Sequence, residues 1–251
     1  MNLNEFFGQH RKAAIAFSGG CDSAFLCYSA RKNGLEFRAY YVKAQFQPEF
    51  EYKDALRFAK EYGIDICVIS ADVLGDENIA ANPSNRCYYC KRKVFSGILK
   101  KAREDGFDII FDGTNASDDA GDRPGMKALT EMKVLSPLRI CGLTKSDVRT
   151  LSKEAGLFTW NKPAYACLAT RIPEGTRITD ELLRNTEEAE GFLFSLGFSD
   201  FRVRYRDGDA LLQLQKEQFE AYEKKRQLIE EELGKYYKAV RLDPVPRGAS
   251  A

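Results

Sequence analysis

The chain has 251 residues, and its 38 lysine and arginine side chains nearly balance 37 aspartates and glutamates, for a formal net charge of +1. This length allows one or two domains with a sizeable core, and the charge balance argues against a protein held on DNA or an anionic membrane by bulk charge. No apolar run approaches the roughly 18 residues of a membrane helix, and the first residues lack a secretory signal, so we expect a cytoplasmic protein without a membrane partner.

Short apolar runs alternate with helical patterns through the first two thirds of the chain. The expected buried strands are 13–17, 37–42, 64–70, 108–111 and 134–138. The expected helices are 23–33, 49–62, 91–104 and one that follows a capping box at 144–147 and runs to Ala155. This alternation predicts an α/β fold with a doubly wound, mostly parallel sheet over residues 1–162.

The pattern changes beyond Arg171. Helices are expected over 179–196 and 217–237, and strands over 201–205, 211–215 and 238–242, with a hairpin turn at Asp207–Gly208. These elements predict a small second α/β domain over 177–245 that serves substrate binding or oligomerisation. Residues 163–176 are expected to be a linker that carries a cysteine loop, and residues 246–251 a disordered tail.

A glycine loop, Ser18-Gly19-Gly20-Cys21-Asp22-Ser23, separates the first expected strand from the first expected helix. Gly19 and Gly20 let the backbone approach an anion closely, and the following helix offers unpaired N–H groups and its positive end. Ser18 and Ser23 add hydroxyl donors. Asp22 would repel a phosphate unless a cation lay between them, which indicates Mg²⁺.

The alternative for this loop is a tight strand-to-helix turn with capping serines, which the full six-residue run disfavours. The loop lacks the lysine and the spacing of a Walker A motif. The run resembles the pyrophosphate loop (PP-loop) of ATP pyrophosphatases. These proteins bind ATP, transfer AMP to a carboxylate or carbonyl oxygen and release pyrophosphate.

Seven cysteines occur in a chain with a single histidine, His10, which makes a mechanism with a central histidine base improbable. Cys87 and Cys90 have the spacing of two thiolates that bind one metal ion or cluster, and three basic residues follow them. Cys167, in the expected linker, is the natural third ligand. Three cysteines without a histidine make an incomplete zinc site but fit a 4Fe–4S cluster with one iron open to an external ligand.

Two alternatives stay open for these three cysteines: unrelated, partly buried thiols, and a structural zinc site. The remaining four are expected to be inert or to serve packing: Cys21, Cys27, Cys67 and Cys141.

Four motifs together resemble the LarE family of ATP-dependent sulfurtransferases: the glycine loop, residues 82–91, residues 112–119 with 123–125, and residues 167–173. The resemblance extends to the Arg202–Arg204 strand. LarE proteins adenylate a carboxylate of pyridinium-3,5-biscarboxylic acid mononucleotide and convert it to a thiocarboxylate, for the nickel-pincer nucleotide cofactor of lactate racemase. The resemblance implies ATP, Mg²⁺, a small-molecule nucleotide substrate and a homo-oligomer, which tends to be a hexamer in the family.

The family divides by its source of sulfur. Some members sacrifice one cysteine, which becomes dehydroalanine, and others hold a 4Fe–4S cluster on three cysteines, with an extra sulfide on the open iron. This chain carries three, at Cys87, Cys90 and Cys167, so the resemblance implies the cluster type. In this scheme Cys167 and Asp22 belong to the catalytic centre. Either Ala166 or Cys167 aligns with the sacrificial position.

Two further groups of residues are expected at the site. Gly113, Asn115 and Asp118 follow the fourth expected strand, at the edge where doubly wound sheets bind ligands, and are expected to contact the nucleotide. A turn with Asx hydrogen bonds is the alternative there.

Arginines at period two form the second group. Arg202, Arg204 and Arg206 share one face of a strand, opposite a core face with Phe201, Val203 and Tyr205. Such a row of guanidinium groups suits a phosphate or a carboxylate, and a solvated strand face is the alternative. The resemblance favours Arg202 and Arg204 as substrate ligands, with Arg171 as a further candidate.

Two other functional classes compete with this interpretation. A tRNA thiolase joins the same loop to three cysteines, but it should bind RNA through a basic surface, which the charge balance disfavours. The second competing class is a nucleotide-binding protein without turnover, with zinc bound to the cysteines. An amide-forming ligase is less favoured because no ammonia-supplying segment is visible.

Overall fold

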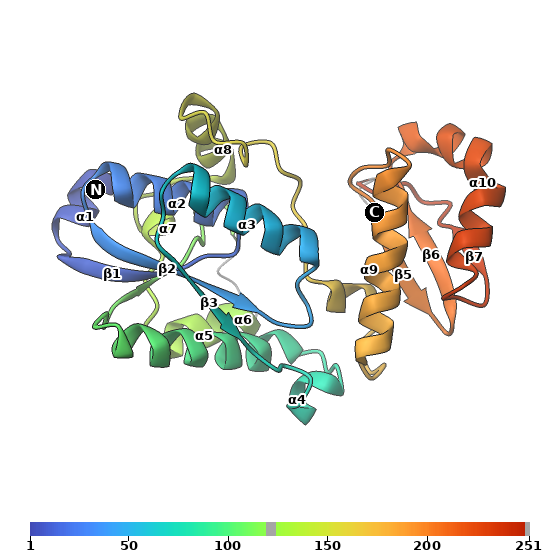
Figure 1. Cartoon of the computed structure of the whole chain (residues 1–251), viewed down its shortest axis with the longest axis horizontal. Coiled ribbons are helices and arrows are strands. Elements are labelled where there is room, and N and C mark those ends of the chain that lie inside the picture. Colours follow the sequence, from blue (N-terminus) through green and yellow to red (C-terminus); the bar gives the residue numbers. More distant parts are fainter. Residues whose placement is uncertain (119–123, 249–251) are drawn as a thin grey trace. The chain divides into compact units, whose positions relative to one another are not determined.

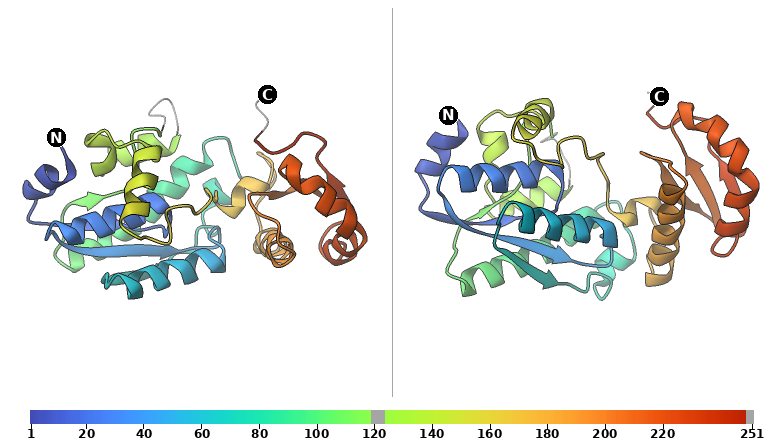
Figure 2. Two further views of the ribbon diagram at one scale, coloured as in Figure 1. Left: turned by 90° about the horizontal axis from the view of Figure 1, so that it is seen from above. Right: turned by 45° about the horizontal axis from the view of Figure 1, so that its top comes forward.

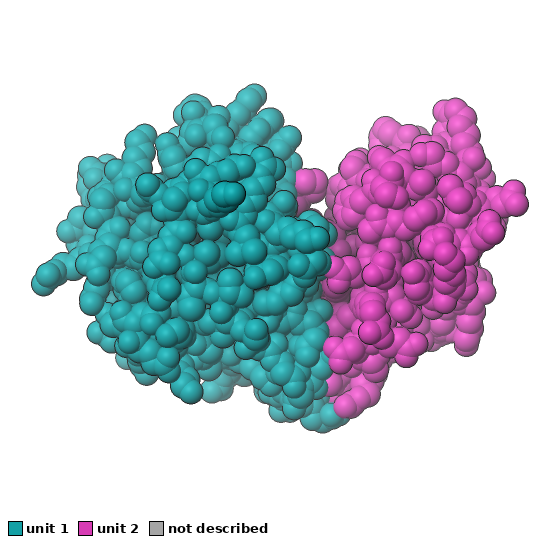
Figure 3. Space-filling view, viewed as in Figure 1, with its two compact units in different colours: residues 1–79, 84–162 teal, residues 80–83, 163–251 magenta. Residues whose placement is uncertain are grey.

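The computed structural model describes residues 1–118 and 124–248. The chain divides into two compact units, one of residues 1–79 and 84–162 and the other of residues 80–83 and 163–251 (Figure 3). The expected linker, 163–176, is therefore part of the second unit. The assignment of residues 80–83 to that unit has no signal in the sequence.

Among the described residues, the first unit contains a parallel sheet of four strands in the order β3-β2-β1-β4 (Figure 1). The strands are β1 (Lys12–Ala16), β2 (Glu36–Lys43), β3 (Ile66–Ser70) and β4 (Ile110–Phe111). Ile15 of β1 lies opposite Ala39 of β2 on one side and Phe111 of β4 on the other. The strand order reverses between β1 and β4, and ligands of such sheets bind at the carboxyl ends of the strands next to this reversal.

Helices cover both faces of this sheet (Figures 1 and 2). One face packs against α1 (Leu3–Gly8), α2 (Cys21–Lys32), α3 (Glu49–Glu61), α7 (Pro137–Ile140) and α8 (Lys145–Glu154). The other packs against α5 (Arg86–Glu104) and α6 (Pro124–Glu131), while α4 (Glu77–Ala80) is a short connecting helix. Successive side chains of β1 alternate between the two cores, Ala13 and Ile15 in the first and Ala14 in the second. The predicted α/β class with a parallel sheet is confirmed.

The capping box at the start of α8 is confirmed. The Thr144 hydroxyl accepts a hydrogen bond from the backbone N–H of Asp147 at 3.2 Å, and the Thr144 N–H donates to the Asp147 carboxylate at 2.9 Å. These reciprocal bonds satisfy N–H groups that the first turn of a helix leaves unpaired.

Most expected elements are present with ends shifted by a few residues, and two differences bear on the site. The strand expected at 134–138 consists of one bridge, between Leu135 and Phe111, because Pro137 opens the helix α7 instead. A proline has no N–H to donate to a sheet, and its fixed φ suits the first turn of a helix. The helix expected from Lys91 begins earlier, at Arg86, so that the cysteine pair lies on its first turns.

The described part of the second unit contains a sheet of three strands, β5 (Arg202–Arg206), β6 (Asp209–Gln213) and β7 (Val240–Leu242). β5 and β6 form the predicted hairpin, whose turn residues Asp207 and Gly208 have φ values of 52° and 100°. Two positive φ angles match a type I′ turn, which fits the twist of a hairpin. β7 runs parallel to β6.

One face of this small sheet packs its apolar side chains against α9 (Asp180–Ser195) and α10 (Phe219–Leu233), and two short 3₁₀ helices are η1 (Leu168–Arg171) and η2 (Lys216–Gln218). The Arg247 N–H donates to the Leu214 carbonyl at 2.8 Å, so the expected tail is hydrogen-bonded at that point. Residues 249–251 of that tail lie outside the described residues. None of the helices within residues 1–118 and 124–248 combines the length and apolar character needed to cross a bilayer.

Candidate functional site

The glycine loop occupies the carboxyl end of β1, beside the reversal of strand order. Gly19 has a φ of 76°, and a Cβ there would lie 3.1 Å from the Ala55 Cβ and 3.3 Å from the Glu51 carbonyl oxygen, so α3 leaves no room for a larger residue. The Ser18 and Ser23 hydroxyls lie 3.1 Å apart, and the Ser18 N–H donates to the Ser23 hydroxyl at 3.2 Å. The predicted turn is therefore tight, and both serines are within it.

The loop after β4 lies directly against the glycine loop. A Cβ on Gly113 would lie 2.8 Å from the backbone nitrogen of Ser23 and 3.1 Å from its Cα, a distance that real Cβ atoms do not adopt. Glycine is thus required where the two loops meet at the first turn of α2. Two segments that sequence analysis predicted to share a nucleotide site are adjacent in the structure.

Asn115 and Asp118 shape that second loop through hydrogen bonds of their own. The Asn115 N–H donates to the Asp118 carboxylate at 2.9 Å, and the Ser117 N–H donates to the Asn115 side-chain oxygen at 2.8 Å. This is the Asx-type turn considered as an alternative. A contact of either residue with a nucleotide stays a prediction. Asp119 and Arg123 of the same motif lie outside the described residues.

Lys145, which sequence analysis did not single out, completes this edge of the sheet. Its ammonium lies 2.6 Å from Asp22 Oδ2, and its backbone N–H donates to the Ser117 hydroxyl at 3.0 Å. Lys145 is the first residue of α8, so the capping box at Thr144 is the sequence signal that could have located it. The lysine joins the glycine loop, the β4 loop and the start of α8.

Asp22 is the natural place for a cation at this edge. Its second oxygen, Oδ1, is buried and has no hydrogen-bond partner among the described residues. A carboxylate oxygen in that condition suits a hard divalent ion such as Mg²⁺, which prefers oxygen ligands and bridges to phosphate oxygens. Asp22 and its neighbours therefore fit the predicted Mg²⁺–ATP.

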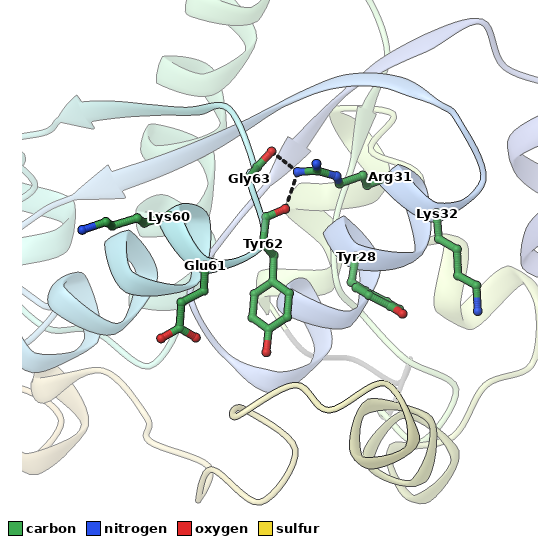
Figure 4. A pocket seen from close by; sticks show the side chains of 7 residues that line it. All are labelled: Tyr28, Arg31, Lys32, Lys60, Glu61, Tyr62 and Gly63. Carbon is green, nitrogen blue, oxygen red and sulfur yellow. Dashed lines mark hydrogen bonds between the residues drawn. The ribbon is translucent and has the colours of Figure 1, made fainter.

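A surface hollow of about 570 Å³ lies at the carboxyl ends of α2 and α3 (Figure 4), whereas the glycine loop lies at the start of α2. Its lining residues are Tyr28, Arg31, Lys32, Lys60, Glu61, Tyr62 and Gly63. The Arg31 guanidinium donates to the carbonyls of Tyr62 and Gly63, just beyond the last turn of α3. A cation at that position stabilises the negative end of the α3 helix. Helix capping therefore accounts for Arg31 in this hollow, and no ligand is needed to explain it.

Cys87 and Cys90 lie on the first turns of α5, three positions apart and hence on one side of the helix. Cys87 is exposed and Cys90 is partly exposed, and an Arg86 guanidinium nitrogen lies 3.8 Å from the Cys87 sulfur. None of the seven cysteines, all of which are described, forms a disulfide. The pair is accessible and has the donor type and spacing that a metal ion or cluster requires.

Cys167 belongs to the second unit, just before η1. The structure brings together there the arginines that sequence analysis named. Arg202 donates to the Ala164 carbonyl and Arg204 to the Thr170 carbonyl, each at 2.8 Å. The segment that carries Cys167 is thus held at both sides by arginines of β5. In the described residues no three histidine, cysteine or acidic side chains are grouped as metal ligands, so a three-cysteine site remains a proposal.

Arg171 holds the same loop from within. Its guanidinium is fully buried, donates to Glu190 at 2.8 and 3.0 Å, and donates to the Ala166 carbonyl at 2.8 Å. Burial lowers the pKa of Arg171, but the hydrogen bonds and charge of Glu190 outweigh that effect and raise it. These contacts give Arg171 a structural role, and a contact of Arg171 with the substrate stays a prediction.

Glu190 is a second residue that sequence analysis missed. This buried carboxylate of α9 also accepts the Val203 N–H at 3.0 Å and the Tyr165 hydroxyl. Burial, followed by the charge of Glu190, raises the pKa of Tyr165. An acidic residue beside Ala189 and near Leu193, on the buried side of a helix, was the available signal.

The predicted arginine row divides in the structure: Arg202 is buried, Arg204 is partly buried and Arg206 is exposed. Phe201 and Val203 are in the core, as predicted, but Arg202 is also buried, with only 6% of its surface exposed. Burial, and then the charges of Arg171 and Arg247, lower the pKa of Arg202 to about 10. Guanidinium groups that repel one another in a dehydrated place would be stabilised by a bound anion. The row therefore fits an anionic substrate group.

No family model matches the sequence. The chain is 36% identical over 225 residues to an uncharacterized protein of Synechocystis sp., covering 88% of this chain and 83% of that one. It is 32% identical over 209 residues to a pyridinium-3,5-bisthiocarboxylic acid mononucleotide synthase of Lactiplantibacillus plantarum, covering 81% of this chain and 75% of that one. A tRNA-specific 2-thiouridylase of Pseudothermotoga lettingae is 26% identical over 65% of this chain and 57% of its own length.

Proposed function

Because the chain belongs to the LarE family of pyridinium-3,5-bisthiocarboxylic acid mononucleotide synthases, we propose that it is an ATP-dependent sulfurtransferase. Its substrate is pyridinium-3,5-biscarboxylic acid mononucleotide, one carboxylate of which becomes a thiocarboxylate. The product serves the nickel-pincer nucleotide cofactor of lactate racemase. The more distant 2-thiouridylases support the coarser statement, a PP-loop enzyme that transfers sulfur.

Adenylation takes place at the glycine loop. A substrate carboxylate oxygen attacks the α-phosphorus of ATP, the bond to the β-phosphate oxygen breaks, and pyrophosphate leaves. The backbone N–H groups of Gly19–Ser23 hold phosphate oxygens, and Asp22 would hold a Mg²⁺ ion, which would offset the phosphate charge. Lys145, whose ammonium lies beside Asp22, offers a positive charge to the phosphates at the same edge. The observation that carries this step is the contact of Gly113 with Ser23, which brings both loops and Lys145 to one edge.

Sulfur transfer uses the three cysteines. Cys87, Cys90 and Cys167 would hold a 4Fe–4S cluster, which would supply the sulfur at the sulfide level. The sulfur forms a bond to the activated carbonyl carbon, and AMP leaves with the former carboxylate oxygen. Arg202 and Arg204 hold an anionic group of the substrate, and Arg171 keeps the cysteine loop in shape. No protein base is needed, which suits a chain whose single histidine, His10, is near its start.

The test is a half-reaction assay on the anaerobically reconstituted full chain with ATP, Mg²⁺ and the pyridinium substrate. Pyrophosphate release and thiocarboxylate formation are measured separately, and the mass of the chain is recorded before and after turnover. Lys145→Met should lower pyrophosphate release by about 10-fold or more, since it removes a charge from the phosphates. Lys235→Met, which breaks an exposed pair with Glu232, is the matched control and should release pyrophosphate as wild type does. Cys167→Ser should release pyrophosphate but form no thiocarboxylate.

Each alternative has its own outcome. Pyrophosphate release with tRNA and not with the pyridinium substrate would replace the proposal with a tRNA thiolase. The absence of pyrophosphate release with either substrate would favour a nucleotide-binding protein without turnover. A chain that loses the sulfur of one cysteine during turnover would overturn the cluster in favour of the sacrificial route.

The proposal includes a homo-oligomer, a hexamer by analogy with the family. Light scattering of the full chain at several concentrations would test this, and a monomer at all concentrations would contradict it.

A further inference from the structure

The helix α5 concentrates positive charge on one element of the first unit (Figure 1). Seven of its 19 residues are basic and one is acidic, which gives this helix a net charge of +6. The whole chain carries +1, so all its other residues together carry −5. The near-neutral balance of the chain therefore hides one strongly basic helix. Its basic residues are Arg86, Lys91, Arg92, Lys93, Lys100, Lys101 and Arg103.

Three exposed members of this set form what we call the α5 basic stripe: Arg92, Lys100 and Arg103. With Ser96 between them, the spacings are four, four and three residues, which bring these positions onto one side of the helix. The opposite side of α5 is apolar and faces the core. The stripe is about 17 Å long, at the usual rise of an α-helix. A surface hollow of about 570 Å³ lies along it, lined by Ser96, Leu99, Lys100, Arg103 and Glu104.

Helix stability does not account for the whole stripe. Cations in the last turn stabilise the negative end of a helix, which explains Lys101 and Arg103. Arg92 and Lys100 lie before that turn, where this effect fades. Lys101 also has acidic partners nearby, but within residues 1–118 and 124–248 no member of the stripe forms an ion pair. Exposed charges of one sign without acidic partners suit an anionic partner from outside the chain.

The stripe begins beside the cysteine pair. Arg92 comes two residues after Cys90, and it donates to the hydroxyl of Tyr88, the residue after Cys87, at 3.0 Å. Cys87 is exposed and Cys90 is partly exposed. A partner bound along the stripe would therefore lie next to both thiols, on the same helix.

We propose that the α5 basic stripe is the docking surface of an acidic protein, which binds beside the cysteine pair. Opposite charges guide such a partner to the surface and fix its orientation there. The inference rests on the proposed function, since the sulfur used in each turnover has to be brought to the cysteine pair from outside the chain. A partner docked on α5 is where that sulfur is received.

Two observations favour a protein over a nucleic acid. A long polyanion would also meet the net charge of −5 on the rest of the chain, whereas a partner with a local acidic patch need not. None of the aromatic side chains of α5 is exposed, so the stripe offers no platform on which bases could stack. The length of the stripe, and Leu99 in the hollow, suit one acidic helix or loop that makes apolar and charged contacts.

The first measurement is fluorescence anisotropy on the iron-free full chain, with a labelled helical peptide of alanine and glutamate as the probe. Wild type should bind the peptide, and more weakly as the salt concentration rises. The stripe variant should bind at least about tenfold more weakly, because three exposed charge contacts are lost. It combines Arg92→Gln, Lys100→Gln and Arg103→Gln.

The matched control removes the same charge from exposed lysines elsewhere in the first unit and should bind the peptide as wild type does. It combines Lys32→Gln, Lys53→Gln and Lys60→Gln. Thermal unfolding is recorded for every variant. Should the stripe variant fail to fold, Lys100→Gln with Arg103→Gln replaces it, with binding about fivefold weaker than wild type.

The second measurement places the bound peptide. Maleimide labelling of each thiol is followed by mass spectrometry, with and without the peptide. The peptide should slow the labelling of Cys87 and Cys90 in wild type by at least about threefold, and not in the stripe variant. Cys141, at the end of α7 on the other face of the sheet, is the internal reference and should label at an unchanged rate.

Each contrary result overturns a stated part of the inference. Equal binding by the stripe variant and the control would show attraction by bulk charge, with no docking surface. RNA that binds wild type more tightly than the peptide, and loses binding in the stripe variant, would replace the protein partner with a nucleic acid. Binding without protection of the two thiols would remove the link to the cysteine pair.

The proposed function is judged by a separate result. The stripe variant should form thiocarboxylate from free sulfide at the wild-type rate, because inorganic sulfide needs no docking surface. If wild type forms none from free sulfide, the proposed function fails, whatever the peptide does. If wild type forms it and the peptide does not bind, the docking surface is overturned and the proposed function stands.

Discussion

The glycine loop and the cysteine loop are built by opposite means. The first is formed almost wholly by backbone: Gly19 fits under α3, and Gly113 fits against the start of α2. Its charged pair, Asp22 with Lys145, lies at a partly exposed edge. Most of its geometry follows from residues that are close together in the chain or that end adjacent strands.

Charged side chains from distant elements shape the cysteine loop instead. Arg171 pairs with Glu190 in a buried position, and Arg202 and Arg204 hold the carbonyls of Ala164 and Thr170. A buried ion pair needs both partners, since either one alone leaves an uncompensated charge. We therefore expect the glycine loop to be disrupted mainly by substitutions that add a side chain. The cysteine loop should be disrupted mainly by substitutions that remove a charge.

The largest effect is expected from Gly113→Ala. The added methyl group would approach the Ser23 nitrogen to 2.8 Å, so the β4 loop or the start of α2 must move. A displacement near 1 Å at a phosphate site is enough to reduce turnover by about 100-fold. ATP-dependent pyrophosphate release is the measurement, with the stability of the variant followed by thermal unfolding.

Gly97→Ala is the matched control. Gly97 lies inside α5, and its added methyl would meet only the Ile69 Cγ2 atom, at 4.0 Å. Alanine is favoured over glycine in a helix by about 1 kcal/mol, so this variant should be slightly more stable and fully active. Equal activity in Gly113→Ala and Gly97→Ala would show that the close approach of the β4 loop to the glycine loop is not needed for activity.

The predictability of the two regions follows from the same difference. The apolar run before Ser18, the two glycines and the capping box at Thr144 carry short-range signals, and the parallel sheet and the tight glycine loop followed from them. The strand expected over 134–138 failed because Pro137 has no N–H to offer a fifth strand. A single sequence contained the local chemistry of this region but not the pairing of Lys145 with Asp22.

Long-range side-chain pairs were out of reach of sequence analysis in the second unit. The period-two pattern at Arg202 and Arg204 identified the face they share, and the core position of Val203 confirmed it. The same pattern could not tell that this face is covered by the cysteine loop, because the carbonyls it binds are more than 30 residues away. The partnership of Arg171 with Glu190 was hidden for the same reason.

The second prediction tests the buried pair. Glu190→Gln removes a carboxylate charge from Arg171, which is fully buried, and should cost about 3–5 kcal/mol of unfolding free energy. The single tryptophan, Trp160, lies in the first unit, so urea unfolding can be followed by its fluorescence and by far-ultraviolet circular dichroism. The circular dichroism signal, which includes the helices of the second unit, should shift to lower urea, while the Trp160 fluorescence transition stays in place.

The pH dependence of this loss has a definite sign. The pKa of Arg171 is raised in the folded state above its ordinary value, so the stability that its charge contributes is fully present at neutral pH and is lost only at strongly alkaline pH. The difference between wild type and Glu190→Gln should therefore be flat from about pH 6 to 9. Glu220→Gln, in an exposed pair with Lys224, should leave both unfolding curves unchanged. A parallel shift of the fluorescence and circular dichroism signals in Glu190→Gln would mean that the two units unfold together. The two loops would then not be stabilised independently of each other.

The smallest effect is expected where the first unit ends. Arg149 of α8 donates to the carbonyls of Trp160 and Lys162, each at 2.8 Å, and the Lys162 ammonium lies 2.8 Å from Asp54 Oδ2. These bonds fix the chain five residues before Cys167, a reach of at most about 18 Å. Arg149→Met combined with Lys162→Met removes both sets of bonds and moves the last fixed point back to the buried Thr159, which lengthens the tether from five residues to eight, about 29 Å.

Lengthening a flexible tether from five residues to eight lowers effective concentration by about twofold, so thiocarboxylate formation by this double variant should fall by that factor while pyrophosphate release stays as in wild type. Arg226→Met, at an exposed site on α10, is the control and should change neither rate. If pyrophosphate release falls together with sulfur transfer, Arg149 acts on the nucleotide side, through the α8 helix that also carries Lys145. The bonds that Arg149 makes at the end of the first unit would then support the glycine loop rather than the cysteine loop.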